Sequence, residues 1–344
     1  MNHSNSQLFA LGRASFEAAR RIEILPPGHP AAGLHGHSFQ LTLQQHGTWE
    51  AERLAQHLAT AVAPLNYSEL NQHLAIPSDG ALLRHLSSTL PPPAAAQLRL
   101  RSAPDQGVEQ WADGSRHAWH RYRFEAAHRL PNVPPDHPCG RMHGHSFGVT
   151  LYLRLSNDDP HALAAAALDR HWSTLHARLH HTCLNQLAGL TNPTSELLSH
   201  WLWQQLRPQL PALSRVSVRE TATAGCDYDG EHFRIWKERT FESALALPQQ
   251  GLGLHGHSYR IRLHLTSPLD ELLGWTVDYG DVKRLFQPLY QQIDHHRLDQ
   301  LPQLPQADTP HLADWLRQRL APALPQLHRI ELWETSCYGV LLEW

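Results

Sequence analysis

The sequence predicts an α+β protein built from three tandem repeats of one folding unit. The tripeptide His-Gly-His occurs three times, starting at His35, His143 and His255, and each copy is followed by Ser and an aromatic residue. Each copy is also preceded by a run of the form F-E-[A/S]-A, and successive copies start 108 and 112 residues apart. Because that period is the size of a domain, the repeats are expected to be domains and not the short units of a solenoid.

Each repeat is expected to run strand, strand, helix, helix, strand, strand, with the last strand weakest in repeat one. The two motif runs alternate polar and apolar residues around a Pro/Gly-rich turn, which is typical of an antiparallel hairpin. A polar junction then separates two helical segments. The first helices are expected at 50–62, 167–179 and 279–293, and the second helices start near Pro77, Pro193 and Pro310. In repeat three, Asp278 is expected to cap the first helix. Asp281, three residues on, is expected to be stabilised by the positive end of the same helix.

The repeat boundaries follow from composition. A Gly/Asp/Ser-rich stretch at 105–117 is expected to be the first linker, and a shorter boundary is expected near 230–238. The three domains are therefore predicted at residues 1–112, 118–231 and 235–344.

Composition excludes several classes of protein. Charged residues make up 18% of the 344 residues, net charge is −3, and no basic stripe indicates a nucleic-acid partner. The four cysteines form no C-x-x-C pair, which favours a reducing compartment over a disulfide framework. The longest apolar run, at 162–168, is too short to span a membrane, and the N-terminus lacks a signal-peptide layout. We expect a soluble, cytoplasmic protein without a membrane partner.

Repeat two carries a set of residues suited to zinc. His143 and His145 lie two apart on a strand and therefore share a face, and His128 on the partner strand lies within reach of both. Three imidazoles with an open fourth position are a catalytic zinc arrangement. Two alternatives remain open: ordinary partnered histidines in a chain with 28 histidines, or a closed structural site with Cys139 as the fourth ligand.

The other two repeats lack the full set. The position of His128 is Arg20 in repeat one and Leu245 in repeat three, and the position of Cys139 is Ala31 and Gly251. Two histidines alone hold zinc poorly, so both sites are expected to be empty.

The junctions and the final strands carry a second set of polar residues. Asp294-His295 in repeat three suggests a general acid/base pair, although a charge pair at a helix end explains the spacing equally well. The same position is His180-His181 in repeat two and Asn66-Tyr67 in repeat one. The final strands carry Glu220, and also Glu334, where repeat one has Ser102; a buried carboxylate there would need partners, such as the N–H groups of a heterocycle.

These motifs together resemble a known family. In repeat two, FEAAHRLPNVP, CGRMHGHSF, LTNPTSELL and VRETATAGC resemble 6-carboxytetrahydropterin synthases, members of the 6-pyruvoyltetrahydropterin synthase family. Repeat three is similar to the same family through GWTVDYGDVKRLF and IDHHRLD, and repeat one is the most diverged.

The resemblance implies a tunnelling fold, in which three four-stranded sheets with two helices each close a twelve-stranded barrel. A single chain would then form a pseudo-trimer, and two chains would stack as a homodimer. It implies a zinc ion on His128, His143 and His145, proton transfer by Cys139, and a pterin held by Glu220. A neighbouring unit supplies the Asp-His pair, so Asp294 and His295 of repeat three are expected to face the zinc half of repeat two.

The implied reaction is conversion of 7,8-dihydroneopterin triphosphate to 6-carboxytetrahydropterin, a precursor of deazapurine nucleosides such as queuosine. Two other functions remain open. Stopping before side-chain cleavage would give the 6-pyruvoyl product. The loss of two sites also allows a non-catalytic scaffold that binds a pterin or zinc.

Overall fold

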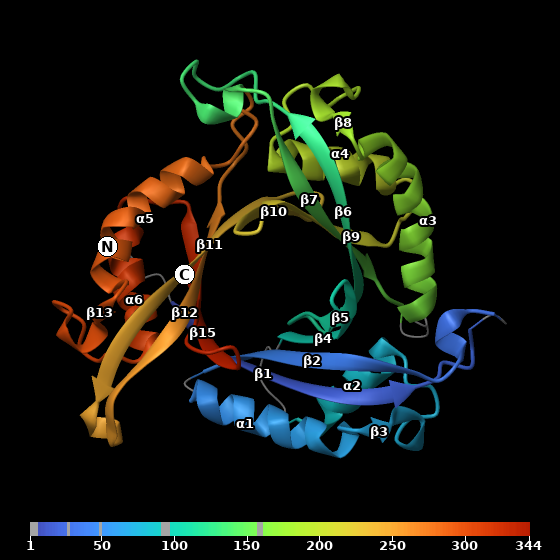
Figure 1. Ribbon diagram of the computed structural model, residues 1–344, viewed down its shortest axis with the longest axis horizontal. Helices are drawn as coiled ribbons and strands as arrows, with labels where there is room; N and C mark the ends of the chain where they lie inside the picture. Colours follow the sequence, from blue (N-terminus) through green and yellow to red (C-terminus); the bar gives the residue numbers. More distant parts are fainter. Residues whose placement is uncertain (1–5, 26–27, 48–49, 91–96, 157–160) are drawn as a thin grey trace.

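The computed structural model describes residues 6–344 except 26–27, 48–49, 91–96 and 157–160. Within these residues the same order of elements occurs three times (Figure 1). The long strands are β1 (Gln7–Arg20), β2 (His35–His46), β4 (Gln97–Ala103) and β5 (Gln106–Gln110) in repeat one, β6 (Arg116–His128), β7 (His143–Arg154), β9 (Leu213–Thr221) and β10 (Ala224–Tyr228) in repeat two, and β11 (Phe233–Leu247), β12 (Leu252–Thr266), β14 (Leu327–Trp333) and β15 (Tyr338–Glu343) in repeat three.

Two helices and one two-residue strand complete each repeat. The helices are α1 (Ala51–Val62), α2 (Asp79–Thr89), α3 (His161–Leu179), α4 (Ser195–Leu206), α5 (Tyr279–Ile293) and α6 (Thr309–Leu320), and the short strands are β3 (Ser68–Glu69), β8 (Thr182–Cys183) and β13 (His296–Arg297). The expected cap is confirmed, because the Asp278 side chain accepts a hydrogen bond from the N–H of Gly280. Helix α3 begins at His161, earlier than expected, since the alanine-rich run before 167 has high helix propensity.

The long strands form one closed antiparallel barrel. Neighbours follow the order β10-β9-β7-β6-β5-β4-β2-β1-β15-β14-β12-β11, and β10 pairs with β11 to close the ring. The helices lie outside the ring, and each repeat forms about one third of it (Figure 1). The predicted pseudo-trimeric barrel of twelve strands is therefore confirmed for the part of the chain that the structure describes.

The stretch 105–117, expected to be a linker, forms a hairpin instead, and the boundary expected near 230–238 lies in a second hairpin. β5 pairs with β6 across 111–115, and β10 pairs with β11 across 229–232, so each boundary joins two repeats edge to edge. A Cβ on Gly107 would lie 2.2 Å from the carbonyl oxygen of Leu100 and 2.7 Å from the ring of Trp119. The glycine therefore permits close packing, where composition alone suggested flexibility. Closing the barrel in this way leaves no exposed strand edge at the repeat boundaries.

Each repeat has its own hydrophobic core between its sheet and its two helices. The aromatic residues of the two sequence motifs stack in pairs at the centre of each core. The pairs, with their ring-centre distances, are Phe16–Phe39 at 4.8 Å, Phe124–Phe147 at 5.0 Å and Phe241–Tyr259 at 4.9 Å. The repeated motif therefore fixes the register of the hairpin that carries the histidines.

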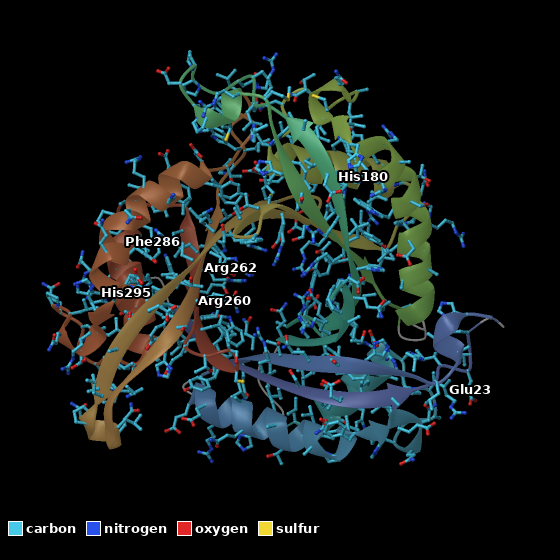
Figure 2. All side chains as sticks on the ribbon, viewed as in Figure 1. Glu23, His180, Arg260, Arg262, Phe286 and His295 are labelled. Carbon is cyan, nitrogen blue, oxygen red and sulfur yellow. The ribbon has the colours of Figure 1, made fainter. Side chains whose placement is uncertain are left out.

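Charged side chains line the inner face of the barrel. Arg260 and Arg262 point toward its centre (Figure 2), and Arg262 pairs with Glu238 at 2.6 Å. None of the helices in the described residues is long and apolar enough to cross a membrane.

Candidate active site between repeats two and three

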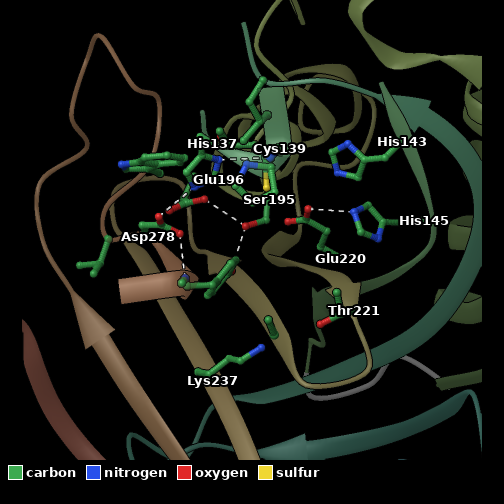
Figure 3. A pocket seen from close by; sticks show the side chains of 18 of the residues that line it. His137, Cys139, His143, His145, Ser195, Glu196, Glu220, Thr221, Lys237 and Asp278 are labelled. Carbon is green, nitrogen blue, oxygen red and sulfur yellow. Dashed lines mark hydrogen bonds and ion pairs between the residues drawn. The ribbon is translucent and has the colours of Figure 1, made fainter. Parts of the chain in front are cut away.

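A cavity of about 580 Å³ lies at the boundary between repeats two and three. Repeat two lines it with the 3-10 turn Pro138–Gly140, the start of β7, the start of α4 and the end of β9. Repeat three lines it with Lys237 of β11 and with the segment 275–280 that leads into α5. Cys139, His143, His145 and Glu220 all face this space (Figure 3).

The three predicted zinc ligands converge beside this cavity. His128 and His143 are register partners on β6 and β7, and His145 lies two residues further along the same face. One potential ligand atom from each histidine and from Glu220 lies within 4.8 Å of the others. The strand pairing predicted from the motif spacing therefore does bring the three imidazoles together.

Hydrogen bonds fix two of these rings in the orientation that metal binding requires. The Nδ1–H of His128 donates to the carbonyl oxygen of Pro193 at 2.9 Å, and that of His143 donates to the carbonyl oxygen of Arg141 at 2.7 Å. Because a carbonyl only accepts, the proton is on Nδ1 in both rings, and each Nε2 is free to bind a metal. Such backbone partners are typical of metal-ligating histidines.

Burial of these nitrogens also fits a cation. The Nε2 atoms of His128 and His145 are buried and, within the described residues, make no hydrogen bond of good geometry. Their nearest charged neighbour is Oε1 of Glu220, at 3.7 and 3.2 Å. Burial lowers the pKa of His128, which favours the neutral form of this imidazole. Burial favours the protonated form of Glu220, but the three imidazoles outweigh it and lower the pKa of this carboxyl. Three imidazoles beside a carboxylate suit zinc.

Cys139 lies in the Pro138–Gly140 turn, between the imidazoles and repeat three (Figure 3). Burial, followed by the charges of Glu220 and Asp278, raises the pKa of its thiol. The charges of the neighbouring residues therefore do not stabilise the thiolate.

The equivalent positions in the other repeats cannot form this cluster. Arg20 and Leu245 are the register partners of His35 and His255, as His128 is of His143. A guanidinium repels a metal ion, and a leucine side chain offers no ligand atom. The two incomplete sites predicted from the sequence are therefore incomplete in the structure as well.

A line of hydrogen bonds joins repeat two to the segment before α5. The side-chain amides of Asn132 and Asn192 donate to the carbonyl oxygens of Leu272 and Leu273, each at 2.7 Å, and the hydroxyl of Thr194 donates to the carbonyl oxygen of Gly274. Gly274 has φ +74°, and a Cβ there would lie 2.6 Å from Leu197. Glycine is therefore required at this close approach.

The sequence interpretation missed a second carboxylate in the cavity. Glu196 is buried on α4, and its Oε1 accepts hydrogen bonds from the N–H and the hydroxyl of Thr276, at 2.8 and 3.0 Å. Burial raises the pKa of Glu196 although these hydrogen bonds oppose it. Its neighbour Ser195 is within hydrogen-bond distance of the Tyr279 hydroxyl, at 2.9 Å. The string LTNPTSELL, which carries part of the resemblance, was the available signal.

The sequence interpretation also missed three other residues at the cavity, which are Lys237, His137 and Asp278. Lys237 belongs to the stretch interpreted as a boundary, and Asp278 was assigned only a capping role. His137 is two residues before Cys139, and nothing in a single sequence shows that its ring reaches repeat three.

The structure does not bring Asp294 and His295 to this cavity. They follow α5, whereas the cavity is bordered by Asp278–Gly280 at the other end of that helix. A helix of 15 residues is about 22 Å long. The side chain of His295 is 75% exposed, and Figure 2 shows it on the flank of repeat three. Repeat three does face the zinc half of repeat two, as expected, but it does so with the start of α5. The catalytic role of the pair stays a prediction.

Asp294 and His295 nevertheless form a defined pair. Asp294 accepts from the N–H of Glu242, and its Oδ1 lies 3.1 Å from Nδ1 of His295. Although burial opposes the shift, hydrogen bonds from Glu242 and His295 lower the pKa of Asp294. His295, His181 and Tyr67 share the same left-handed backbone, with φ of 58°, 57° and 54°. The junction therefore has one conformation in all three repeats.

Comparison with known proteins gives relatives of the length of one repeat. A 6-carboxy-5,6,7,8-tetrahydropterin synthase from Synechocystis sp. is 35% identical over 115 residues, which are 31% of this chain and 88% of the relative. A dihydroneopterin monophosphate aldolase from Pyrococcus furiosus is 28% identical over 115 residues, 32% of this chain and 97% of the relative. Among solved structures, the 6-pyruvoyl tetrahydropterin synthase of Caenorhabditis elegans matches with a TM-score of 0.29 and 17% identity, over 31% of this chain and 92% of that one.

The family model described as 6-pyruvoyl tetrahydropterin synthase matches this chain twice, at residues 118–231 and 234–342. These two matches cover repeats two and three, between which the cavity lies. The chain belongs to the 6-pyruvoyl tetrahydropterin synthase family.

Proposed function

We propose that the chain is a zinc-dependent 6-carboxytetrahydropterin synthase that acts on 7,8-dihydroneopterin triphosphate. The observation that carries this proposal is the cluster of three imidazoles with Glu220, which adjoins a cavity between repeats two and three that Cys139 and Glu196 also line. The product would serve as a precursor of deazapurine nucleosides, including queuosine.

His128, His143 and His145 would hold the zinc ion. When bound there, zinc supplies a Lewis acid that acidifies the hydrogens on the carbons of the pterin side chain. The backbone partners of His128 and His143 keep their Nε2 atoms directed at one point, so the protein provides the geometry in advance.

Cys139 moves the proton at the reacting carbon. Its turn places the thiol on the cavity wall near His143 and His145 (Figure 3). The raised pKa of the thiol means that an acid/base partner must accept its proton before the thiol can act as a base.

Glu220 anchors the pterin ring in this proposal, through hydrogen bonds from the ring N–H groups. Glu196 is a second glutamate on the same cavity wall, and its Oε2 accepts a hydrogen bond from the hydroxyl of Ser195. Arg141 and Lys237 supply cationic side chains on the cavity wall, which suits a substrate with phosphate groups.

Asp294 and His295 act on the site of a second copy of the chain. They lie too far along α5 to reach the cavity of their own chain, so a partner must bring them there. One end of the barrel is suited to such contact: Leu34, Met142 and Leu254, directly before each His-Gly-His, are 57%, 55% and 64% exposed. Two chains stacked through these tips form the proposed homodimer of pseudo-trimers.

The proposal is tested by incubating the zinc-loaded protein with 7,8-dihydroneopterin triphosphate and identifying the products by mass spectrometry. We expect 6-carboxytetrahydropterin and inorganic triphosphate, and Cys139→Ala should lower kcat by about 100-fold or more, as the loss of a proton-transfer group does. Cys183→Ala, at a half-buried thiol that does not line the cavity, is the matched control.

Other products would assign a different activity. The 6-pyruvoyl compound would place the chain with the enzymes that stop before cleavage. A 6-hydroxymethyl pterin would indicate an aldolase reaction, such as the Pyrococcus relative's name describes. Bound zinc or bound pterin without any turnover would support the scaffold.

A further inference from the structure

Repeat three alone has a long connection between its second strand and its first helix. Twelve residues, 267–278, separate β12 from α5, whereas four separate β2 from α1 and six separate β7 from α3. This connection is the segment that hydrogen bonds to Asn132, Asn192 and Thr194 of repeat two. It therefore occurs only where it contacts the repeat that carries the thiol.

The connection ends in a contact with the turn that carries Cys139. Oδ2 of Asp278 lies 3.1 Å from Nε2 of His137, and Nδ1 of His137 accepts a hydrogen bond from the N–H of Cys139 at 3.2 Å (Figure 3). Both side chains are mostly buried, with exposed fractions of 19% for His137 and 24% for Asp278. The ring of Trp275 lies beside that of His137, 5.7 Å away.

These contacts determine the tautomer of His137. The backbone N–H of Cys139 only donates, so Nδ1 must be the unprotonated nitrogen, and Nε2–H must then be the donor to Asp278. Oδ1 of Asp278 accepts from the N–H of Gly280, so Asp278 is fixed to the start of α5 at the same time. One continuous line of hydrogen bonds therefore runs from α5 of repeat three to the backbone of Cys139.

We propose that His137 and Asp278 are positioning residues, which hold the Cys139 turn in place by anchoring it to repeat three. With both ring nitrogens engaged, His137 is not free to take the proton of the thiol, so its role is structural support of the reacting group. The pair explains why repeat three keeps its long connection although its own His-Gly-His site has lost the third histidine and the cysteine. The inference rests on the proposed role of Cys139, but its first test needs no substrate.

The test measures the rate at which iodoacetamide alkylates Cys139 in the full chain, followed by mass spectrometry, with exposed Cys337 as the internal reference. His137→Asn keeps an acceptor for the N–H of Cys139 but is too short to reach Asp278. His137→Gln reaches toward Asp278 but removes that acceptor. We expect each variant to speed alkylation of Cys139 by about fivefold, the effect of one lost hydrogen bond, with the rate at Cys337 unchanged.

Asp278→Asn breaks the same line from the other side, and Asp281→Asn is its matched control. Asp281 is an exposed residue in the same helical turn and pairs with Arg284, so its replacement removes the same charge without touching His137. Asp278→Asn also removes a negative charge that faces the thiol, which by itself favours the thiolate. The His137→Asn variant leaves that charge in place and separates positioning from charge.

Turnover gives the second readout. All three variants at His137 and Asp278 should lower kcat with little change in KM, because the turn and not the substrate is displaced. The double variant His137→Asn/Asp278→Asn should be no slower than the worse single variant, since both cut one line of contacts. An alkylation rate of wild-type value in His137→Asn, or additive losses in the double variant, would overturn the inference. If no pterin triphosphate is turned over at all, the proposed function fails while the alkylation result still decides the positioning role.

Discussion

Arg20 and Asp79 form a buried ion pair in repeat one, with Nη1 and Oδ1 2.5 Å apart, at the place where repeat two carries its third histidine. Both side chains are at most 3% exposed. Asp79 also accepts a hydrogen bond from Ser102, which stands where repeat two has Glu220. The guanidinium therefore brings a fixed positive charge to the position in which repeat two would bind a metal ion.

Replacing Arg20 should therefore destabilise the barrel strongly. Arg20→Met leaves Asp79 buried without its cation, and we expect a loss of about 3–5 kcal/mol in the free energy of unfolding. Chemical denaturation of the variant measures this loss. The double variant Arg20→Met/Asp79→Asn should recover most of it, and a double variant as unstable as the single one would contradict the ion-pair explanation.

The same guanidinium contributes, after burial, to the lowered pKa of His37. Burial, and then the charge of Arg20, lowers the pKa of His37 to about 4, while an unfolded histidine titrates near 6.5. Between these values the unfolded chain binds more protons than the folded one, so the contribution of His37 to stability is present above pH 6.5 and is lost as the pH falls toward 4. NMR titration should show that His37 is neutral at pH 5 in the native chain. In Arg20→Met, the midpoint of the His37 titration should move to a higher pH. Titration near 6.5 in the native chain would contradict this prediction.

The order of strands and helices in each repeat was predicted well because its evidence was local and repeated three times, whereas the closed barrel was implied by the family resemblance. The strand register that joins His128 to His143 follows from alternation, and the stacked Phe124 and Phe147 lie in the same motifs. Only the stretch 105–117 was interpreted wrongly, as a linker, because glycine occurs both in flexible segments and at close contacts. The positions of Leu100 and Trp119 show that Gly107 serves close packing.

The candidate site was predictable only where its parts lie on one hairpin. The contact between His137 and Asp278 joins residues 141 positions apart across a repeat boundary, and no periodicity encodes it. Repeat three does face the zinc half of repeat two, as expected, but the sequence did not show that it meets the cavity with the start of α5, and not with the end that carries Asp294 and His295. Knowing which two repeats are neighbours does not determine which of their surfaces are in contact.

Metal content should be close to one zinc per chain. His128→Ala should abolish this binding, because the other two imidazoles alone hold zinc poorly, and metal analysis after dialysis measures it. A second group, Glu125 with His180 and His181, also has ligand atoms within 4.8 Å of one another, but Glu125 and His181 are exposed. His180→Gln is therefore the matched control and should retain the zinc. Three zinc ions per chain would contradict the single complete site.

The two glutamates of the cavity should differ in their effect on pterin binding. If Glu220 anchors the pterin, Glu220→Gln should raise KM and weaken binding of a pterin without a phosphate chain by about tenfold or more, as the loss of a charged hydrogen-bond acceptor does. Glu196→Gln should have a smaller effect on ring binding and should loosen the contact with Thr276 instead. Fluorescence titration with the pterin compares the two variants. The reverse order of effects would assign the ring to Glu196.

A mixture of two inactive chains should recover activity if the partner supplies Asp294 and His295. A chain with Cys139→Ala has an intact pair, and a chain with His295→Ala has an intact thiol. In a mixed dimer, one of the two sites then contains both, while neither variant alone has a complete site. After the chains are unfolded and refolded together in equal amounts, half of the dimers are mixed, so activity should return to about one quarter of the native value.

The control for this experiment is a mixture in which both variants lie on the same side of the proposed site. Chains with Cys139→Ala and with His143→Ala both lack the zinc half, so no combination of them restores a site. Recovery in the first mixture but not in the second would require the pair to act between chains, because α5 keeps it from the cavity of its own chain. Absence of recovery in refolded, dimeric protein would show that Asp294 and His295 do not complete the site of the partner.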